Sequence, residues 1–228
     1  MLAHRQRRLS LNACREKRVS ILLVIFFAVF VWSAFRPHDY FTWFLEVVPA
    51  IIGLAVLAPT YTRFRFTTGV YCIILLHAIV LLVGGHYTYA QVPVGNWFRD
   101  HFHLARNHFD RLGHFLQGFT PALVSREVLL RNRIVLQDNV RRGGWLSFIV
   151  FAISMMITAL YELFEYAMSV ATGSAADAFL GTQGDPWDAQ NDMLMCMIGT
   201  LTALIVFSPW QDRWIEKFEP AQQAAHSA

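Results

Sequence analysis

The chain has 228 residues, of which 55% are hydrophobic and only 15% are charged, and its formal net charge is +3. The charged fraction is too low for an ordinary soluble domain, and several apolar runs are as long as a bilayer is thick, so the sequence predicts an all-α, polytopic membrane protein. The positive charge does not indicate nucleic-acid binding, because Lys and Arg are concentrated in the short segments between apolar runs, where they set membrane orientation.

The apolar runs predict a bundle of about six membrane spans and no separate soluble domain. A basic tail, residues 1–20, precedes the first span and resembles the start of a signal peptide. No small-x-small cleavage site follows this span, so we expect an uncleaved anchor. The spans are expected at about 21–35, 40–60, 67–85, 110–130, 145–170 and 190–210, followed by a tail at 211–228.

The fourth span is ambiguous, because its apolar part, Leu112 to Val124, is short and contains Pro121. The distribution of positive charge favours its existence. With this span, fifteen of the 19 Lys and Arg residues lie on the side of the termini and four on the other; without it, the numbers are eight and eleven. The positive-inside rule therefore predicts six spans with both termini cytoplasmic. In the fourth loop, the fifteen include Arg126, Arg131, Arg133, Arg141 and Arg142.

Ionisable residues occur in three spans at positions that this topology brings to the outer face. They open the fourth span, close the fifth and open the last: Asp110, Arg111 and His114, then Glu162 and Glu165, then Asp185, Asp188 and Asp192. Glu46 in the second span is expected on the same face, and helical spacing puts Asp110, His114 and Gln117 on one stripe. Charges at hydrocarbon depth are costly and normally face a bundle interior or a wet cavity, so this convergence predicts a functional site.

The acidic residues of the last span also have structural interpretations. Asp185 followed by Pro186 is typical of a helix N-cap with proline at the first helical position. Asp188 would then lie in the first turn, where the helix dipole favours an anion. Asp192 lies a turn deeper, where capping does not explain it.

The other polar residues have alternatives as well. Glu162 and Glu165 are like charges one turn apart, which is unfavourable unless a cation or shared proton joins them or one of them pairs with Arg111. His114 can be a metal ligand or an ordinary buried, hydrogen-bonded histidine. The loop from Asn96 to Phe109 is interpreted as an interfacial segment, or as a lid, rather than as a metal cluster, although it holds His101, His103 and His108.

Three motifs carry a resemblance to a known family. They are Asn107–Phe115 (NHFDRLGHF), Tyr161–Glu165 (YELFE) and Gly184–Asp192 (GDPWDAQND). With these motifs, the segment from about Thr67 to Val206 resembles the YjdF-like bacterial inner-membrane proteins, a family with no established biochemical activity. The resemblance implies a multi-pass protein of the bacterial inner (plasma) membrane.

A more distant resemblance is to the VanZ-like family, which is associated with teicoplanin resistance. Its pattern is an Asp-Lys/Arg-x-x-His element, a Glu-x-x-Gln element and an Asp-rich element before the final span. The matching residues are Asp110, Arg111 and His114 for the first, Glu162 for the second and Asp188 for the third. Glu165 stands where Gln is usual and Asp192 where Asn is expected, and these extra acids favour a metal or proton role over a direct transfer of that family's function.

The first function hypothesis is a membrane-embedded enzyme, or a ligand-binding protein, that holds a divalent metal cation at the outer face. A cation would offset the clustered carboxylates, and a metal-bound water supplies a nucleophile near neutral pH. Anionic, phosphate-bearing lipids or lipid-linked molecules are the expected ligands, with Arg99, Arg106 or Arg111 binding their oxygens. The candidate catalytic residues are His114, Glu162, Glu165 and Asp192, supported by Asp110 and Arg111; the candidate metal ligands are His114, Glu162, Asp188 and Asp192.

Two other function classes fit the same residues. A cation- or proton-coupled transporter would use the buried acids as a relay. Against it, the acids gather at one face, and the sequence has no inverted repeat of the kind that many transporters show. A non-catalytic envelope accessory protein would use the polar cluster only to hold its helices together.

Overall fold

The computed structural model describes residues 2–134 and 144–226, with side chains described for 15–134, 144–173 and 176–218. No strand occurs in these ranges, and the chain folds into long helices. They are α1 (Leu2–Ala34), α2 (Tyr40–Thr60), α3 (Thr68–Tyr87), α5 (Phe109–Arg131), α6 (Gly144–Thr172), α8 (Asp188–Thr202) and α9 (Ser208–His226), with a π-helical turn, η4 (Ala203–Phe207), joining the last two. The short elements are η1 (Tyr89–Gln91), α4 (Pro93–Phe102), η3 (Gly173–Ala176) and α7 (Asp177–Leu180).

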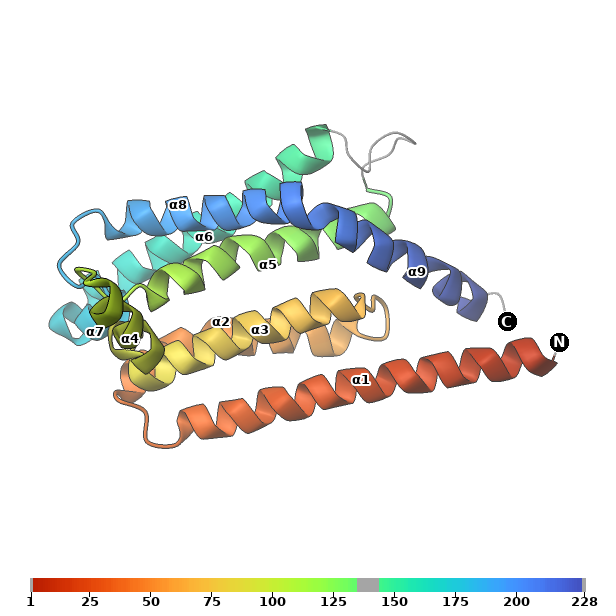
Figure 1. Ribbon diagram of the computed structural model, residues 1–228, viewed down its shortest axis with the longest axis horizontal. Helices are drawn as coiled ribbons and strands as arrows, with labels where there is room; N and C mark the ends of the chain where they lie inside the picture. Colours follow the sequence, from red (N-terminus) through yellow and green to blue (C-terminus); the bar gives the residue numbers. More distant parts are fainter. Residues whose placement is uncertain (1, 135–143, 227–228) are drawn as a thin grey trace.

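The long helices run back and forth, so that the chain crosses the bundle six times, with α8, η4 and α9 forming the last crossing (Figure 1). Both termini lie at one end, here named the terminal end. The short helices α4 and α7 lie at the opposite end, here named the site end (Figure 1). This arrangement confirms the predicted all-α bundle of about six spans with both termini on the same side.

Helix α5 is the crossing that differs from the others. Within the described residues, five segments are long and apolar enough to cross a membrane, namely Arg15–Ala34, Tyr40–Thr60, Thr68–Tyr87, Gly144–Thr172 and Asp188–Phe218. Helix α5 is absent from this set, yet it packs against α3, α6 and α8. Its buried residues include Asp110, Arg111, Arg126 and Glu127. A span surrounded by other helices does not face lipid, so it does not need an apolar surface, and this is why the fourth span is ambiguous in the sequence.

Three helix boundaries differ from those expected. Helix α1 already begins at Leu2, so the basic tail continues the first span as helix, and the last crossing continues beyond residue 210 to His226. The prediction that Asp185 caps a helix starting at Pro186 is wrong, because α8 begins at Asp188. The Asp185 carboxylate instead closes a turn by accepting a hydrogen bond from the Trp187 N–H at 2.9 Å.

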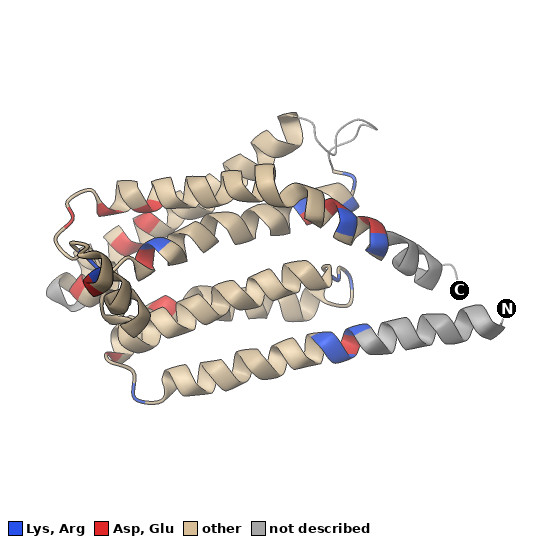
Figure 2. Cartoon of the chain, viewed as in Figure 1, with Lys and Arg blue, Asp and Glu red and all other residues tan. Residues whose placement is uncertain are grey.

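Basic residues gather toward the terminal end and acidic residues toward the site end (Figure 2). This separation is the pattern on which the positive-inside argument rests, and it favours a cytoplasmic location for the terminal end. Arg141 and Arg142, which that argument places on the same side, lie outside the described residues.

A network of buried charges joins α5 to its neighbours at the terminal end. Arg126, 2% exposed, donates to Oε1 of Gln211 at 3.0 Å and to Oδ1 of Asp212 at 2.7 Å. Glu127 accepts from the N–H and the hydroxyl of Thr67, both at 2.8 Å. It also accepts from Arg131, one turn along α5, at 2.6 Å. These paired charges attach the second half of α5 to α9 and to the start of α3.

At mid-bundle, α5 and α8 approach each other closely through two glycines. A Cβ atom on Gly118 would overlap the carbonyl oxygen of Cys196, and one on Gly199 would overlap the carbonyl oxygen of Phe115. The Thr200 hydroxyl donates to the Gly118 carbonyl at 3.2 Å across this contact. Small residues at helix crossings allow such backbone approach in membranes.

We predict that Gly199→Ala lowers the free energy of unfolding by about 2 kcal/mol, because the new methyl group must push the two backbones apart. Thermal unfolding of the detergent-purified protein, followed by tryptophan fluorescence, measures this change. Gly53→Ala is the control, since a Cβ on Gly53 meets nothing within 4 Å. Equal melting temperatures for the two variants would contradict the close-contact interpretation.

Candidate functional site

Two arginines near the start of α5 bind the segment that leads into α8. Arg106 donates through Nη1 to Asp188 Oδ1 at 2.6 Å and reaches Asp185 Oδ2 at 3.4 Å. Arg111 donates through Nη2 to the same two oxygens, at 2.9 Å and 3.1 Å. Arg106 also donates to the carbonyl of Gly181 at 3.2 Å. The Asp188 carboxylate therefore lies between two guanidinium groups, and the start of α8 is attached to the start of α5.

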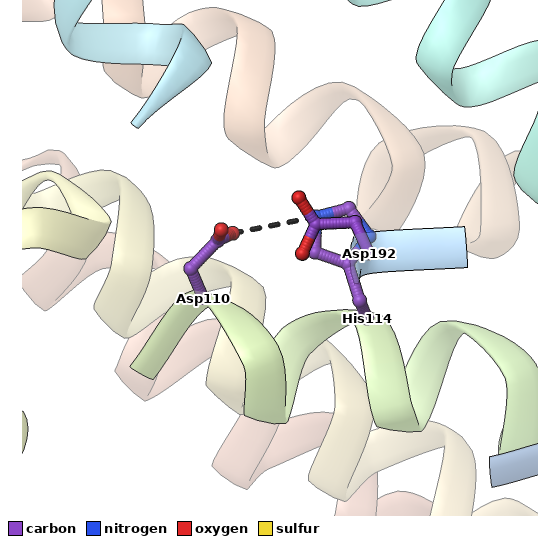
Figure 3. A group of neighbouring side chains, drawn as sticks. All are labelled: Asp110, His114 and Asp192. Atoms are coloured by element: carbon purple, nitrogen blue, oxygen red, sulfur yellow. Dashed lines mark ion pairs between the residues drawn. The ribbon is translucent and has the colours of Figure 1, made fainter. Parts of the chain in front are cut away.

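One turn deeper, two carboxylates and a histidine converge. Arg111 Nη1 binds Oδ1 of Asp192, a residue only 1% exposed. The same oxygen lies 3.6 Å from His114 Nε2, and Asp110 Oδ1 lies 3.3 Å from that nitrogen. Asp110 and His114 are one turn apart on α5, and Asp192 reaches them from α8 (Figure 3). One ligand-type atom from each of the three buried residues lies within 4.8 Å of the other two, which is close enough to hold one metal ion.

The other nitrogen of His114 faces a different helix. His114 Nδ1 lies 3.9 Å from Oε1 of Glu162 on α6 and 3.9 Å from the Cys196 sulfur on α8. Glu162 Oε1 is buried and has no hydrogen-bond partner within the part of the chain that the structure describes. The imidazole thus lies between the Asp110–Asp192 pair on one side and Glu162 on the other.

A small polar cavity adjoins this group. Its walls come from five helical elements, and the space for the centre of a water molecule is about 10 Å³, the size of a site for one water or one ion. The lining residues are Glu46, Leu81, Tyr89, Asp110, Gly113, His114, Gln117, Tyr161 and Glu165. Glu165 therefore faces this cavity, whereas Glu162, three residues earlier, faces His114 Nδ1.

The structure brings together the site residues that the sequence predicts, but some of them contact other partners than those expected. Asp188, which the sequence predicts as a metal ligand, is bound to Arg106 and Arg111 instead. The carboxylate that lies beside His114 and Asp192 is that of Asp110. Arg111 pairs with aspartates of the α8 segment and with neither Glu162 nor Glu165 among the ion pairs of the described residues. The chemical roles assigned to these residues remain predictions.

The histidines of the α4 segment do not join the cluster. His101 is exposed and stacks on Trp97, with ring centroids 5.2 Å apart. His103 is also exposed. Partial burial, with Arg106 and Arg111 nearby, lowers the pKa of His108. These observations agree with the interfacial interpretation of the segment.

Asn107 is a positioning residue that the sequence did not reveal. It is fully buried, and its side-chain amide donates to the carbonyls of Ala90 and Val92 and to the side chain of Asn96, at 3.0 to 3.2 Å. Its side-chain oxygen accepts from the Phe109 N–H at 2.9 Å, and its backbone exchanges two hydrogen bonds with the Gln183 side chain. Asn107 thus ties η1, α4, the start of α5 and the α7–α8 loop together. Only its place in the NHFDRLGHF motif hinted at this role.

Comparisons with known proteins place this chain in a family. A family model described as "Predicted membrane protein (DUF2238)" matches residues 18–213. The chain belongs to this DUF2238 family. It is also 43% identical over 190 residues to inner membrane protein YjdF of Escherichia coli (strain K12), an alignment that covers 83% of this chain and 88% of that protein. No solved structure matches the chain.

Membership in DUF2238 and the similarity to YjdF confirm the resemblance to YjdF-like proteins, and they do not show the one to VanZ-like proteins. With five membrane-length apolar helices in the described residues, this DUF2238 protein is a multi-pass protein of the bacterial inner membrane and lies in its lipid bilayer.

We predict that Asn107→Ala lowers the free energy of unfolding by about 3 kcal/mol, because several buried hydrogen-bonding groups lose their partner. Asn132→Ala is the matched control, since Asn132 is exposed and makes one side-chain hydrogen bond within its own helix turn. Thermal unfolding in detergent compares the two variants. A similar loss of stability in both would show that the hydrogen bonds of Asn107 do not hold the site end together.

Asp185 lies outside the spans, and we expect its carboxylate to make the stability of the site end sensitive to acid. The hydrogen bond from the Trp187 N–H is the largest cause that lowers the pKa of Asp185 from its ordinary value of 3.8, with smaller contributions from Asn191, Arg111 and Arg106. A carboxyl whose pKa is lower in the folded than in the unfolded state stabilises the fold at pH values above its unfolded-state pKa. This contribution is lost as the pH falls through the folded-state pKa. We predict that the melting temperature of Asp185→Asn falls less steeply below pH 3.8 than that of the unmodified protein. Parallel curves would contradict this assignment.

Proposed function

We propose that the protein binds a divalent cation between Asp110, His114 and Asp192 at the outward-facing site end of the inner membrane. We further propose that the bound cation serves a phosphate-bearing lipid or lipid-linked ligand, either in hydrolysis or in binding alone. The observation that carries the proposal is the convergence of one nitrogen and two carboxylate oxygens within 4.8 Å, all on buried residues. Imidazole and carboxylate together suit several divalent metals, including Mn²⁺ and Zn²⁺.

The charge balance of the cluster supports a cation. The guanidinium groups of Arg106 and Arg111 face four aspartates, Asp110, Asp185, Asp188 and Asp192. Each aspartate contacts an arginine, but two positive charges face four negative ones, and such an excess of negative charge is costly at this site. A divalent cation beside Asp110 and Asp192 would balance this excess.

The orientation of His114 also supports a metal ligand. If Nε2 binds the cation beside Asp110 and Asp192, then Nδ1 carries the proton and points toward Glu162 at 3.9 Å. Metal-ligating histidines usually donate their second ring N–H to a carboxylate, which fixes the ring and raises its basicity. In this proposal Glu162 orients His114, and Asp110 and Asp192 ligate the cation directly.

A ligand would approach from the side of α4. This short helix exposes Trp97, Phe98 and Phe102, which suit the membrane–water interface. Arg106 and Arg111 are already bound by aspartates. Arg99 on α4 is partly exposed, and among the ion pairs of the described residues it pairs with its neighbour Asp100 alone, so it is the arginine best placed to meet an anionic headgroup. A cation-bound water would supply the nucleophile for hydrolysis.

One observation favours the accessory alternative. Arg111 bonds to three aspartates of the α8 segment, so the network without any metal already holds α5 against α8. A purely structural cluster of this kind would bind no ion. Metal binding therefore separates the two functions.

We predict that the chelator-treated protein in detergent binds Mn²⁺, measured by isothermal titration. Asp192→Asn and His114→Gln should each weaken this binding about 100-fold, because each removes a direct ligand. Glu162→Gln should weaken it 10- to 100-fold, the usual effect of losing an orienting partner. Asp100→Asn, the same substitution at an exposed position, should leave it unchanged. Binding by Asp192→Asn that equals that of the unmodified protein, in samples with unchanged melting temperature, would refute the proposal.

A further inference from the structure

The polar cavity beside His114 contains more carboxyl groups than the proposed cation site uses. Glu46 enters it from α2 and Glu165 from α6, while Asp110 lines it from α5. Among the ion pairs of the described residues, none joins Glu46 or Glu165 to an arginine, lysine or histidine. Glu46 is only 3% exposed. The side-chain hydrogen-bonding neighbours of Glu46 are the hydroxyls of Tyr89 and Tyr161, which are neutral.

Asp110 adds a second observation, a buried carboxylate oxygen that accepts no hydrogen bond within the described chain. The residue is 7% exposed, and its Oδ2 atom is buried without a hydrogen bond from any residue that the structure describes. Its nearest cationic atom is Nη2 of Arg106 at 3.6 Å. The other oxygen, Oδ1, lies beside His114 Nε2 at 3.3 Å. The two oxygens of Asp110 can therefore serve two different positions.

The remaining wall of the cavity adds neutral oxygen donors. The ring of Tyr89 fits against Gly84 and Gly113, where added Cβ atoms would overlap it or press on it, so these glycines keep the tyrosine at the cavity. Tyr161 also lines the cavity, and its ring lies 6.1 Å from that of His114, at an interplanar angle of 67°. The buried amide nitrogen of Gln117 has no hydrogen-bond partner in the described chain, and rotation of that amide would present its oxygen instead.

We propose that this cavity is a second cation site, for a hard cation such as Mg²⁺, Mn²⁺ or Ca²⁺, with the Asp110 carboxylate bridging it to the first. The ligands are the carboxylates of Glu46, Glu165 and Asp110, completed by Gln117 and the tyrosine hydroxyls. All of them are oxygen donors, which hard cations prefer. The space suits one ion rather than a substrate. The inference goes beyond the proposed function, because its carboxylates on α2 and α6 belong to no part of the first site.

The experiment measures Mn²⁺ stoichiometry and electron paramagnetic resonance on the full-length protein in detergent. The unmodified chain should bind two ions, with the spectral broadening expected for two Mn²⁺ ions about 4 Å apart. Glu165→Gln should bind one ion with an unbroadened spectrum, because it retains the His114 site. Asp192→Asn should also bind one ion, held in the cavity. Glu16→Gln, a change at an exposed glutamate, is the control and should bind two.

Each other outcome has a definite meaning. Loss of the only bound ion in Asp192→Asn, with no change in Glu165→Gln, would overturn the second site and leave the first. The reverse pattern would overturn the first site and leave the second. No ion in the unmodified protein at any pH would overturn both and indicate protonated carboxylic acids in the cavity.

Tyr161→Phe removes only a hydroxyl and tests the second site even if Glu165→Gln fails to fold. It should lower the affinity for the second ion at least threefold, and unchanged affinity would count against the site.

Discussion

The structure depends on one constraint: a charged residue that α5 carries into the bundle must find its partner on another helix. An unpaired charge at this depth is strongly unfavourable, so removing either member of a buried pair costs more than the pair itself contributes. Arg111 reaches Asp188 and Asp192 on α8, and Arg126 reaches Asp212 on α9. These pairs fix the register of α5 against the last crossing at both ends, and the glycine contact between them lets the two backbones come close enough.

The same constraint explains which parts of the fold could be predicted from the sequence. The distribution of Lys and Arg in the loops indicated α5 although its own surface is polar, because orientation depends on loop charge and not on the apolarity of any one helix. Once the number of crossings is known, the direction of every helix follows. Asp110, Glu162 and Asp192 then have to lie at the same end, and the structure has all three beside His114.

The partners of each side chain could not be predicted in the same way. Glu162 and Glu165 are three residues apart, which separates their directions by about 60° around α6. One faces His114 and the other the cavity, and this depends on the rotation of α6, which the sequence pattern does not specify. Asn107 and Tyr89 lie between the long helices and resemble ordinary loop residues. Their importance arises from tertiary contacts, such as the space that Gly84 and Gly113 leave for a tyrosine ring.

The two ends of α5 provide an internal comparison for the function of its charges. At the terminal end, Arg126 is paired with Asp212 and Arg131 with Glu127, so each of these carboxylates has a cation, as expected of a network that only holds helices together. At the site end, carboxylates outnumber the arginines, and a histidine and a cavity lie among them. Both clusters belong to the same helix and the same bundle, so helix association alone explains the first and leaves the surplus of the second unexplained. The proposed cation would account for that surplus.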